Sequence, residues 1–82
     1  MNTLTTREAV AKRISQLLES KKMTLYKLSL ESGVLYNTLK KVNSGTSKTV
    51  TLDVVIQVAS GFNMTLAEFA DDPIFNEDNL KL

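Results

Sequence analysis

The sequence of 82 residues contains no cysteine and no histidine, which excludes disulfides, thiol catalysis and metal sites built from those side chains. One domain with a single modest core is expected at this length. The net charge of +1 conceals an uneven distribution: residues 1–48 hold nine Lys or Arg against three Glu, whereas residues 49–82 hold one Lys against six acidic residues. Clustered positive charge suits phosphate binding, although it also fits a solvated helix face.

The first predicted helix begins after Thr5 and runs to about Ser20. Thr5, with Glu8 three residues later, fits a capping box, in which side chain and backbone form reciprocal hydrogen bonds. Apolar residues then recur at intervals of three and four, which gives one helix face a continuous stripe for the core: Val10, Ile14, Leu17 and Leu18.

Two short helices with a tight turn between them are predicted next. Thr24 caps the first, and Gly33 ends it because glycine tolerates the left-handed conformation of a sharp helix stop. The second covers about residues 36–43. Ser29 is small where two such helices would approach closely, and Val34 would fill the turn. This layout is typical of a helix-turn-helix, which holds its second helix in the major groove of DNA.

Two further helices and an acidic tail complete the predicted order. Thr51 caps a fourth helix that ends at Gly61, and Thr65 caps a fifth through about Ala70. The β-branched run at 54–56 also suits a strand, but the flanking periodicity is helical. Four residues of the fourth helix are expected to face the core: Leu52, Val55, Ile56 and Ala59. Val54 and Val58 are expected to widen this apolar face.

These elements predict an all-α fold, in which one five-helix domain over residues 1–70 precedes a short acidic tail over residues 71–82. In the tail, Ile74 and Phe75 are expected to fold back on the core or to join a dimer interface. The last few residues are expected to fray. No stretch approaches the roughly 20 apolar residues of a membrane span, so no membrane partner and a cytoplasmic location are expected.

The outer face of the third predicted helix carries side chains suited to DNA. At 100° per residue, Leu39 and Val42 define the buried side, and Asn37 and Lys41 lie together on the opposite side. Asparagine pairs bidentately with adenine, and lysine donates to guanine or to phosphate. Tyr36 begins this helix, where its ring could meet a thymine methyl group or its hydroxyl could reach a phosphate. The same side chains would also suit an ordinary solvated face.

Residues 25–44 resemble the helix-turn-helix of phage Cro and CI-type repressors, the XRE family, and the similarity extends over about residues 10–69 as a lambda-repressor-like domain. The resemblance implies a transcriptional regulator of double-stranded DNA, usually a homodimer on a palindromic operator and here expected to be a repressor. It places the base-contacting residues at Tyr36, Asn37 and Lys41. Phosphate contacts are expected at the start of the second helix, on the third helix and in the loop after it: Thr24, Lys27, Lys40, Ser44, Thr46 and Lys48.

Two residues depart from the family's pattern. Leu25 stands where a glutamine commonly reaches a phosphate, so a contact there would have to come from a backbone N–H or from Lys27. Leu35 stands where Ser or Thr commonly caps the recognition helix, and it is expected to be a hydrophobic staple or a core residue rather than a base contact.

Two other classes of function remain to be weighed. Enzyme activity lacks support, because the carboxylate pairs at 71–72 and 77–78 lie at a helix breaker and in the tail, and no cofactor motif or metal-site motif is present. The stronger alternative is a protein-interaction module of the same fold, an antitoxin or a phage regulatory partner, in which DNA binding is secondary. Its docking segment would be the apolar residues of the tail, Ile74, Phe75, Leu80 and Leu82.

Overall fold

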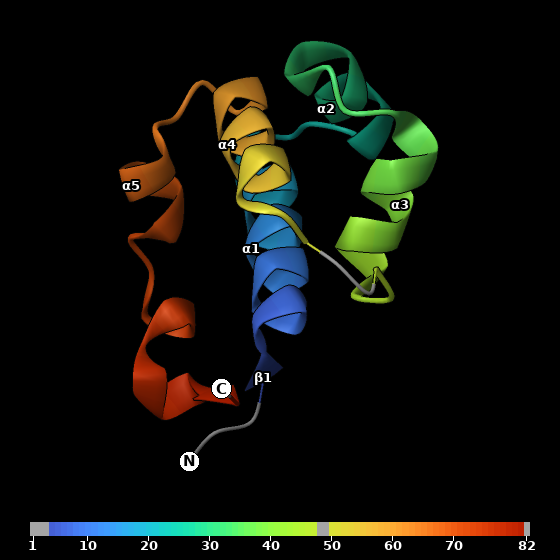
Figure 1. Cartoon of the computed structure of the whole chain (residues 1–82). Helices are drawn as coiled ribbons and strands as arrows, with labels where there is room; N and C mark the ends of the chain where they lie inside the picture. The colour runs from blue at the N-terminus through green and yellow to red at the C-terminus, as the bar shows by residue number, and fades with distance from the viewer. Residues whose placement is uncertain (1–3, 48–49, 82) are drawn as a thin grey trace.

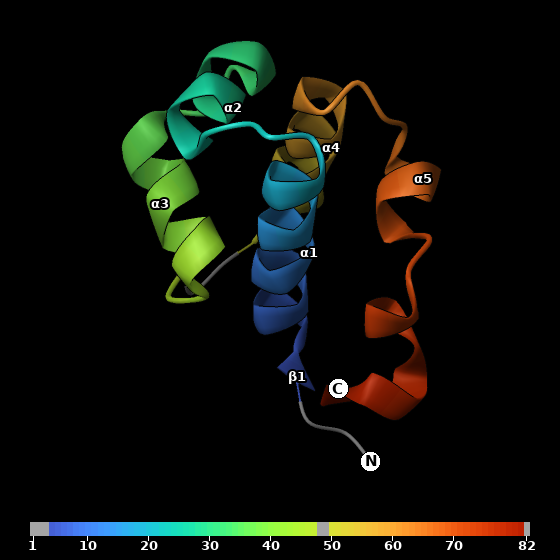
Figure 2. The same cartoon turned by 180° about the vertical axis from the view of Figure 1, so that it is seen from behind.

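A computed structural model describes residues 4–47 and 50–81. The described part of the chain contains five α-helices: α1 (Thr6–Ser20), α2 (Leu25–Ser32), α3 (Tyr36–Ser44), α4 (Leu52–Gly61) and α5 (Leu66–Ala70). Helices α2 and α3 lie to one side of α1, and α5 lies to the other (Figures 1 and 2). The all-α, five-helix prediction is confirmed. No helix in the described ranges has the length and apolar character needed to cross a membrane.

The helix boundaries follow from the predicted caps. The Thr5 amide donates to the Glu8 carboxylate at 2.8 Å, and the Glu8 amide donates to the Thr5 hydroxyl at 3.2 Å, which completes the capping box of α1. Thr65 and Glu68 form the same pair of bonds at α5. Gly33 ends α2 in the left-handed conformation, at φ +78°, where a side chain would be strained.

The main core joins α1 to the helix-turn-helix and to α4. Its largest fully buried side chains come from all five helices and from the residue that follows α4: Phe62, Phe69, Ile14, Leu28, Leu39, Val42 and Val58. Helix α1 packs against α3, whereas α4 packs against α2 and α5. The core therefore fixes the position of both helices of the predicted DNA-binding motif.

The predicted inward face of α4 is wrong in two of its four residues. Leu52 is 63% exposed and Ile56 is 44% exposed, whereas Val58 and Ala59 are buried. The cause is the close approach of α4 to α2 at Gly61, where a Cβ atom would lie 2.8 Å from the Cβ of Ser32. Leu52 precedes Gly61 by nine residues, which at 100° per residue places it on the opposite side of α4.

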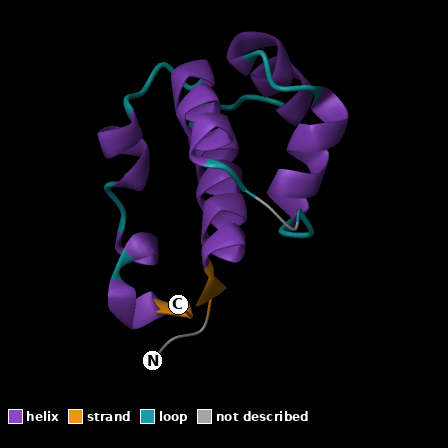
Figure 3. Ribbon diagram, viewed as in Figure 1, coloured by secondary structure: helices purple, strands orange, loops and turns teal. Residues whose placement is uncertain are grey.

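The expectation that the last residues fray is also wrong for the described part of the tail. After two 3₁₀ turns, Pro73–Phe75 and Glu77–Asn79, strand β2 (Leu80–Lys81) pairs in parallel with β1 (Leu4–Thr5). Figure 3 shows the two short strands together below α1. Ile74 and Leu80 are buried against Ala9 of α1, so burial of apolar surface holds this segment in place.

Candidate nucleic-acid interface

Helix α3 is fixed from its inner side, which leaves its outer side free. Leu39 is 0% exposed and Val42 is 1% exposed, as predicted from the helix period. The hydroxyl of Ser15 on α1 donates to the side-chain oxygen of Asn43 at 3.2 Å, so Asn43 contributes to the attachment of α3 rather than to its outer face. These contacts restrict α3 to one orientation relative to α1.

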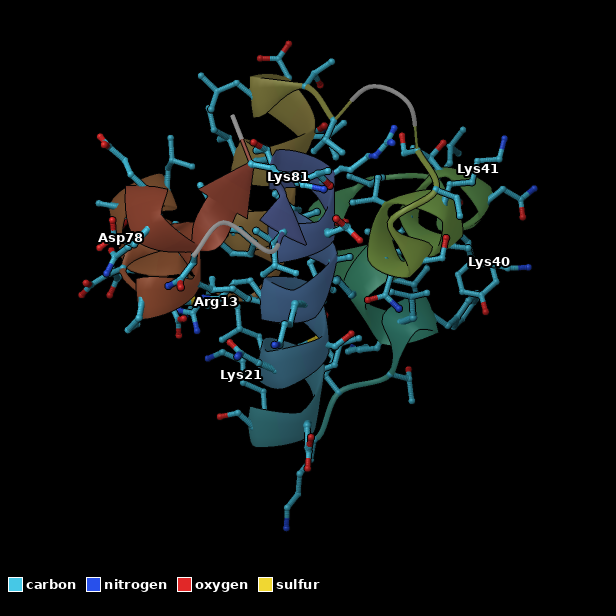
Figure 4. All side chains as sticks on the ribbon, turned by 90° about the horizontal axis from the view of Figure 1, so that it is seen from below. Arg13, Lys21, Lys40, Lys41, Asp78 and Lys81 are labelled. Atoms are coloured by element: carbon cyan, nitrogen blue, oxygen red, sulfur yellow. The ribbon has the colours of Figure 1, made fainter. Side chains whose placement is uncertain are left out.

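The structure brings the predicted base-contacting residues together on the outer face of α3. Tyr36, Asn37, Lys40 and Lys41 are all exposed. Figure 4 shows that Lys40 and Lys41 extend away from the body of the molecule, on the side opposite Asp78. Helix α3 contains no acidic residue, so this face presents cations and hydrogen-bonding groups without a carboxylate that would repel phosphate.

A tyrosine that the sequence patterns did not single out joins this face from α2. The rings of Tyr26 and Tyr36 meet edge to face, with 5.8 Å between their centroids and 73° between their planes. The ammonium group of Lys40 lies 5.5 Å from the centroid of the Tyr36 ring. In the sequence, Tyr26 could have been noticed as an aromatic residue at the second position of α2 that does not belong to the inward positions Leu25, Leu28 and Ser29.

The start of α2 offers hydrogen-bond donors beside α3. The amides of Lys27 and Leu28 bond to Thr24, through its hydroxyl at 3.1 Å and its carbonyl at 3.0 Å. The amides of Leu25 and Tyr26 lie in the same first turn, where helical N–H groups have no carbonyl partner within the helix. The Lys27 ammonium forms an ion pair with Glu31 at 2.9 Å, so this predicted phosphate ligand already has a partner.

The hydroxyl groups of Ser44, the last residue of α3, and of Thr46, just after it, form hydrogen bonds at the C-terminal end of that helix. Ser44 donates to the carbonyl of Lys41 at 3.0 Å, and its oxygen lies 2.7 Å from the hydroxyl of Thr46. The Thr46 hydroxyl also lies 3.5 Å from the same carbonyl. A phosphate contact by either hydroxyl would replace one of these bonds. Lys48, the remaining predicted phosphate ligand, lies outside the described residues.

Leu35 is neither a staple nor a core residue, contrary to the prediction. It is 76% exposed, and its side chain makes no capping hydrogen bond at the start of α3. The adjacent Val34 is only 6% exposed and occupies the interior of the turn. Because Val34 already fills that space, the side chain of Leu35 projects into solvent.

Not all of the positive charge in residues 1–48 is available to a ligand. Arg13 donates from Nε to the carbonyl of Phe69 at 2.8 Å and pairs with Asp72 at 3.4 Å. This guanidinium satisfies carbonyl groups at the end of α5, where a helix carries partial negative charge. Arg13 is therefore a structural cation, and the uncompensated positive charge of the basic face comes from Lys40 and Lys41 of α3, since Lys27 of α2 is paired with Glu31.

The capping boxes also fix the charge of two glutamates. Hydrogen bonds from the amide and hydroxyl of Thr5 lower the pKa of Glu8 below its usual range. Those from Thr65 lower the pKa of Glu68 in the same way. Both carboxylates are therefore ionised at neutral pH, next to the positive ends of their helices.

A hollow of about 270 Å³ lies elsewhere among the described residues, and its lining comes from β1, α1 and the C-terminal segment: Leu4, Lys12, Gln16, Ile74 and Asn79. Within the same ranges, no three acidic side chains gather as a metal site would require. The lining of the hollow includes no residue of α2 or α3.

Comparison with known proteins places this geometry in a family. No curated protein matches the chain. The crystal structure of an HTH_3 family transcriptional regulator from Vibrio cholerae is similar, with a TM-score of 0.72 and 25% sequence identity. The similarity covers 82% of this chain and 38% of the regulator's chain, so the present chain corresponds to less than half of that protein. The family described as the Cro/C1-type HTH DNA-binding domain matches residues 13–73, which include α2, α3 and the turn between them. The chain belongs to the family of Cro/C1-type helix-turn-helix DNA-binding domains.

Proposed function

We propose that this chain is a transcriptional regulator, a repressor, that binds a specific sequence of double-stranded DNA in the cytoplasm with α3 in the major groove. The observation that carries this proposal is the exposed, acid-free outer face of α3, held in one orientation by the burial of Leu39 and Val42. The similar solved protein is itself named a transcriptional regulator. Domains of this family are in general not enzymes.

Base recognition is assigned to Tyr36, Asn37 and Lys41. Asn37 and Lys41 are one helical turn apart on the exposed side of α3, so both can reach edges in the same groove. An asparagine amide matches the N6 and N7 atoms of adenine, and a lysine ammonium donates to O6 or N7 of guanine. Tyr36 is the first residue of α3, and the N-terminal residues of a recognition helix are the ones that contact base edges.

Phosphate contacts are assigned to the surroundings of this face. The first turn of α2 presents the Thr24 hydroxyl, whose oxygen accepts from Lys27 while its proton remains free to donate. Lys40 and Lys27 add positive charge, the latter by exchanging Glu31 for a phosphate. Three residues at the end of α3 and in the loop after it complete the assignment: Ser44, Thr46 and Lys48. Ser44 and Thr46 would each exchange an intrachain hydrogen bond for the phosphate contact.

A homodimer on a palindromic operator is proposed from the surface of α4. Leu52 and Ile56 are exposed one turn apart, and α4 directly follows the loop that ends the DNA-binding motif. A second copy is the occupant that fits this apolar pair, because a two-fold contact covers the same patch on both subunits. Such a dimer would place its two recognition helices about 34–36 Å apart, one turn of DNA.

The experiment that tests this function selects bound sequences from a random duplex pool at two salt concentrations. An enriched palindrome is expected for the unaltered chain, and Asn37→Ala should relax one base position at a cost of about 1–3 kcal/mol. Gln16→Ala, at an exposed position of α1 that faces the C-terminal segment, is the matched control and should leave the preference intact. A preference unchanged by Asn37→Ala would refute the base-reading assignment.

The protein-interaction alternative is favoured by a different result. Weak, unselective binding that high salt abolishes would leave DNA recognition secondary. The docking segment that the sequence predicts in the tail has little free apolar surface, since Ile74 and Leu80 are buried against α1 and Phe75 packs on Phe69 with 6.0 Å between ring centroids. Leu82 lies outside the described residues.

A further inference from the structure

Two exposed tyrosines contact each other at the edge of the DNA-binding face. Tyr26 of α2 is 59% exposed and Tyr36 of α3 is 40% exposed, so their contact is not part of the buried core. Their rings meet nearly at right angles, at 73°, with centroids 5.8 Å apart. This is the edge-to-face arrangement that the charge distribution of aromatic rings favours. The pair therefore holds two surface side chains in a defined relative position.

Lys40 extends this contact along α3. It follows Tyr36 by one helical turn, and its ammonium group lies 5.5 Å from the centroid of the Tyr36 ring. A cation above an aromatic face is attracted by the negative charge of that face. Tyr36 is thus contacted by Tyr26 from α2 and by Lys40 from the next turn of α3. Tyr26, Tyr36 and Lys40 are called the tyrosine–lysine stack below.

The tyrosine–lysine stack restricts the side-chain torsions of Tyr36 and Lys40, to which the proposed function assigns contacts with DNA. A tyrosine has two side-chain torsions, and ordering it on binding costs conformational entropy unless its position is already fixed. The contacts already order the Tyr36 ring in the free protein, so less conformational entropy is lost when DNA binds. Restricting Tyr36 also restricts Lys40, because the preferred place of the ammonium group moves with the ring beneath it.

We propose that Tyr26 is a positioning residue for DNA recognition, which holds Tyr36 and, through it, Lys40 in the orientation in which they meet the major groove. The proposal rests on the proposed roles of Tyr36 in base recognition and Lys40 in phosphate binding. It extends the recognition surface from α3 to α2, and it gives Tyr26 a ring contact rather than a direct hydrogen bond to DNA.

The first test uses the free protein and does not depend on DNA. Proton NMR of the full chain should show that Tyr26→Ala shifts the ring protons of Tyr36, because the neighbouring ring current is lost. Leu30→Ala is the matched control, since Leu30 lies one turn further along α2 and is 61% exposed. Unchanged Tyr36 resonances in Tyr26→Ala would overturn the proposed positioning.

The second test is a double-mutant cycle on DNA binding with Tyr26→Ala, Tyr36→Ala and the double variant. Each single variant should weaken binding to the selected duplex more than to a scrambled one. The two effects should be coupled by about 2- to 10-fold, the range of an aromatic pair. Tyr26→Phe keeps the ring and should bind like the unaltered chain. Urea denaturation of each variant controls for loss of folding.

The outcomes separate this inference from the function on which it rests. A Tyr36→Ala variant with an unaltered sequence preference would overturn both the base-reading role of Tyr36 and the positioning role of Tyr26. An altered preference in Tyr36→Ala, with strictly additive effects of the two variants, would overturn only the positioning role. Equal loss in Tyr26→Phe and Tyr26→Ala, of the same size on the selected and the scrambled duplex, would instead identify a phosphate contact by the Tyr26 hydroxyl.

Discussion

Lys40 and Lys27 differ in what surrounds their charge, and the difference predicts how each responds to salt. The Lys40 ammonium group lies over the Tyr36 ring, an uncharged partner that leaves its positive charge uncompensated. The Lys27 ammonium lies 2.9 Å from the carboxylate of Glu31 and is already compensated. Contact with a phosphate by Lys40 therefore releases a DNA counterion, whereas Lys27 must first give up Glu31.

The expected magnitude follows from counterion release. One phosphate contact contributes about −0.9 to the slope of log K against log salt concentration. Between 50 and 200 mM salt, a fourfold change, that slope corresponds to about a 3.5-fold loss of affinity per contact. Lys40→Ala should thus make the slope shallower by about 0.9. The affinity advantage of the unaltered chain over this variant should shrink about 3.5-fold across the same range.

The assay is fluorescence anisotropy of a labelled duplex at several salt concentrations, with both the selected and a scrambled sequence. Lys40→Ala should weaken binding to both duplexes, and Lys27→Ala should change the slope less. Lys21→Ala is the matched control, because Lys21 lies near the end of α1, well away from Lys40 and Lys41 (Figure 4). A slope unchanged by Lys40→Ala, or changed equally by Lys21→Ala, would refute the assignment.

Three further predictions concern packing, pH and assembly. Gly61→Ala should destabilise the fold by about 1–3 kcal/mol, measured by urea denaturation, because its Cβ would lie 2.8 Å from the Cβ of Ser32; Ser60→Ala should have little effect. The pKa of Glu68 is lower in the folded state than its value of about 4.3 in the unfolded chain. The capping bonds of the ionised carboxylate therefore stabilise the fold fully above the unfolded pKa, and this stabilisation is lost as the pH falls through the folded pKa. The stability difference between the unaltered chain and Glu68→Gln should therefore change between pH 6 and 3 and stay constant above pH 6. Leu52→Glu should shift sedimentation of the chain toward the monomer, and an unchanged distribution would exclude α4 from the dimer contact.

The features that could be predicted from sequence are those set by near neighbours in the chain. Thr5, Thr24, Thr51 and Thr65 each cap a helix by accepting a bond from the amide three residues later, so local sequence determines where these helices begin. Gly33 ends α2 for an equally local reason. The buried and outer sides of α3 follow from the period of the helix.

The features that could not be predicted depend on residues far apart in the sequence. The rotation of α4 is set by contact between Gly61 and Ser32, and no pattern within α4 records it. The attachment of Arg13 to Phe69 spans 56 positions. Tyr26 was missed as a neighbour of Tyr36 because their contact depends on how α2 crosses α3. Tertiary packing decided each of these, and it changed the candidate site by adding Tyr26 and by exposing Leu35.

Packing also explains how a chain with a net charge of only +1 presents a basic face. Arg13, Ile74 and Leu80 attach α5 and the C-terminal segment to α1, so this acidic region lies on the far side of α1 from α3 (Figures 1 and 2). A helix with its side chains is about 10–12 Å across, whereas the Debye length at physiological salt is about 8 Å. The carboxylates of this region therefore contribute little to the potential at the outer face of α3. The same contacts that bury the tail thus keep its negative charge away from the proposed DNA surface.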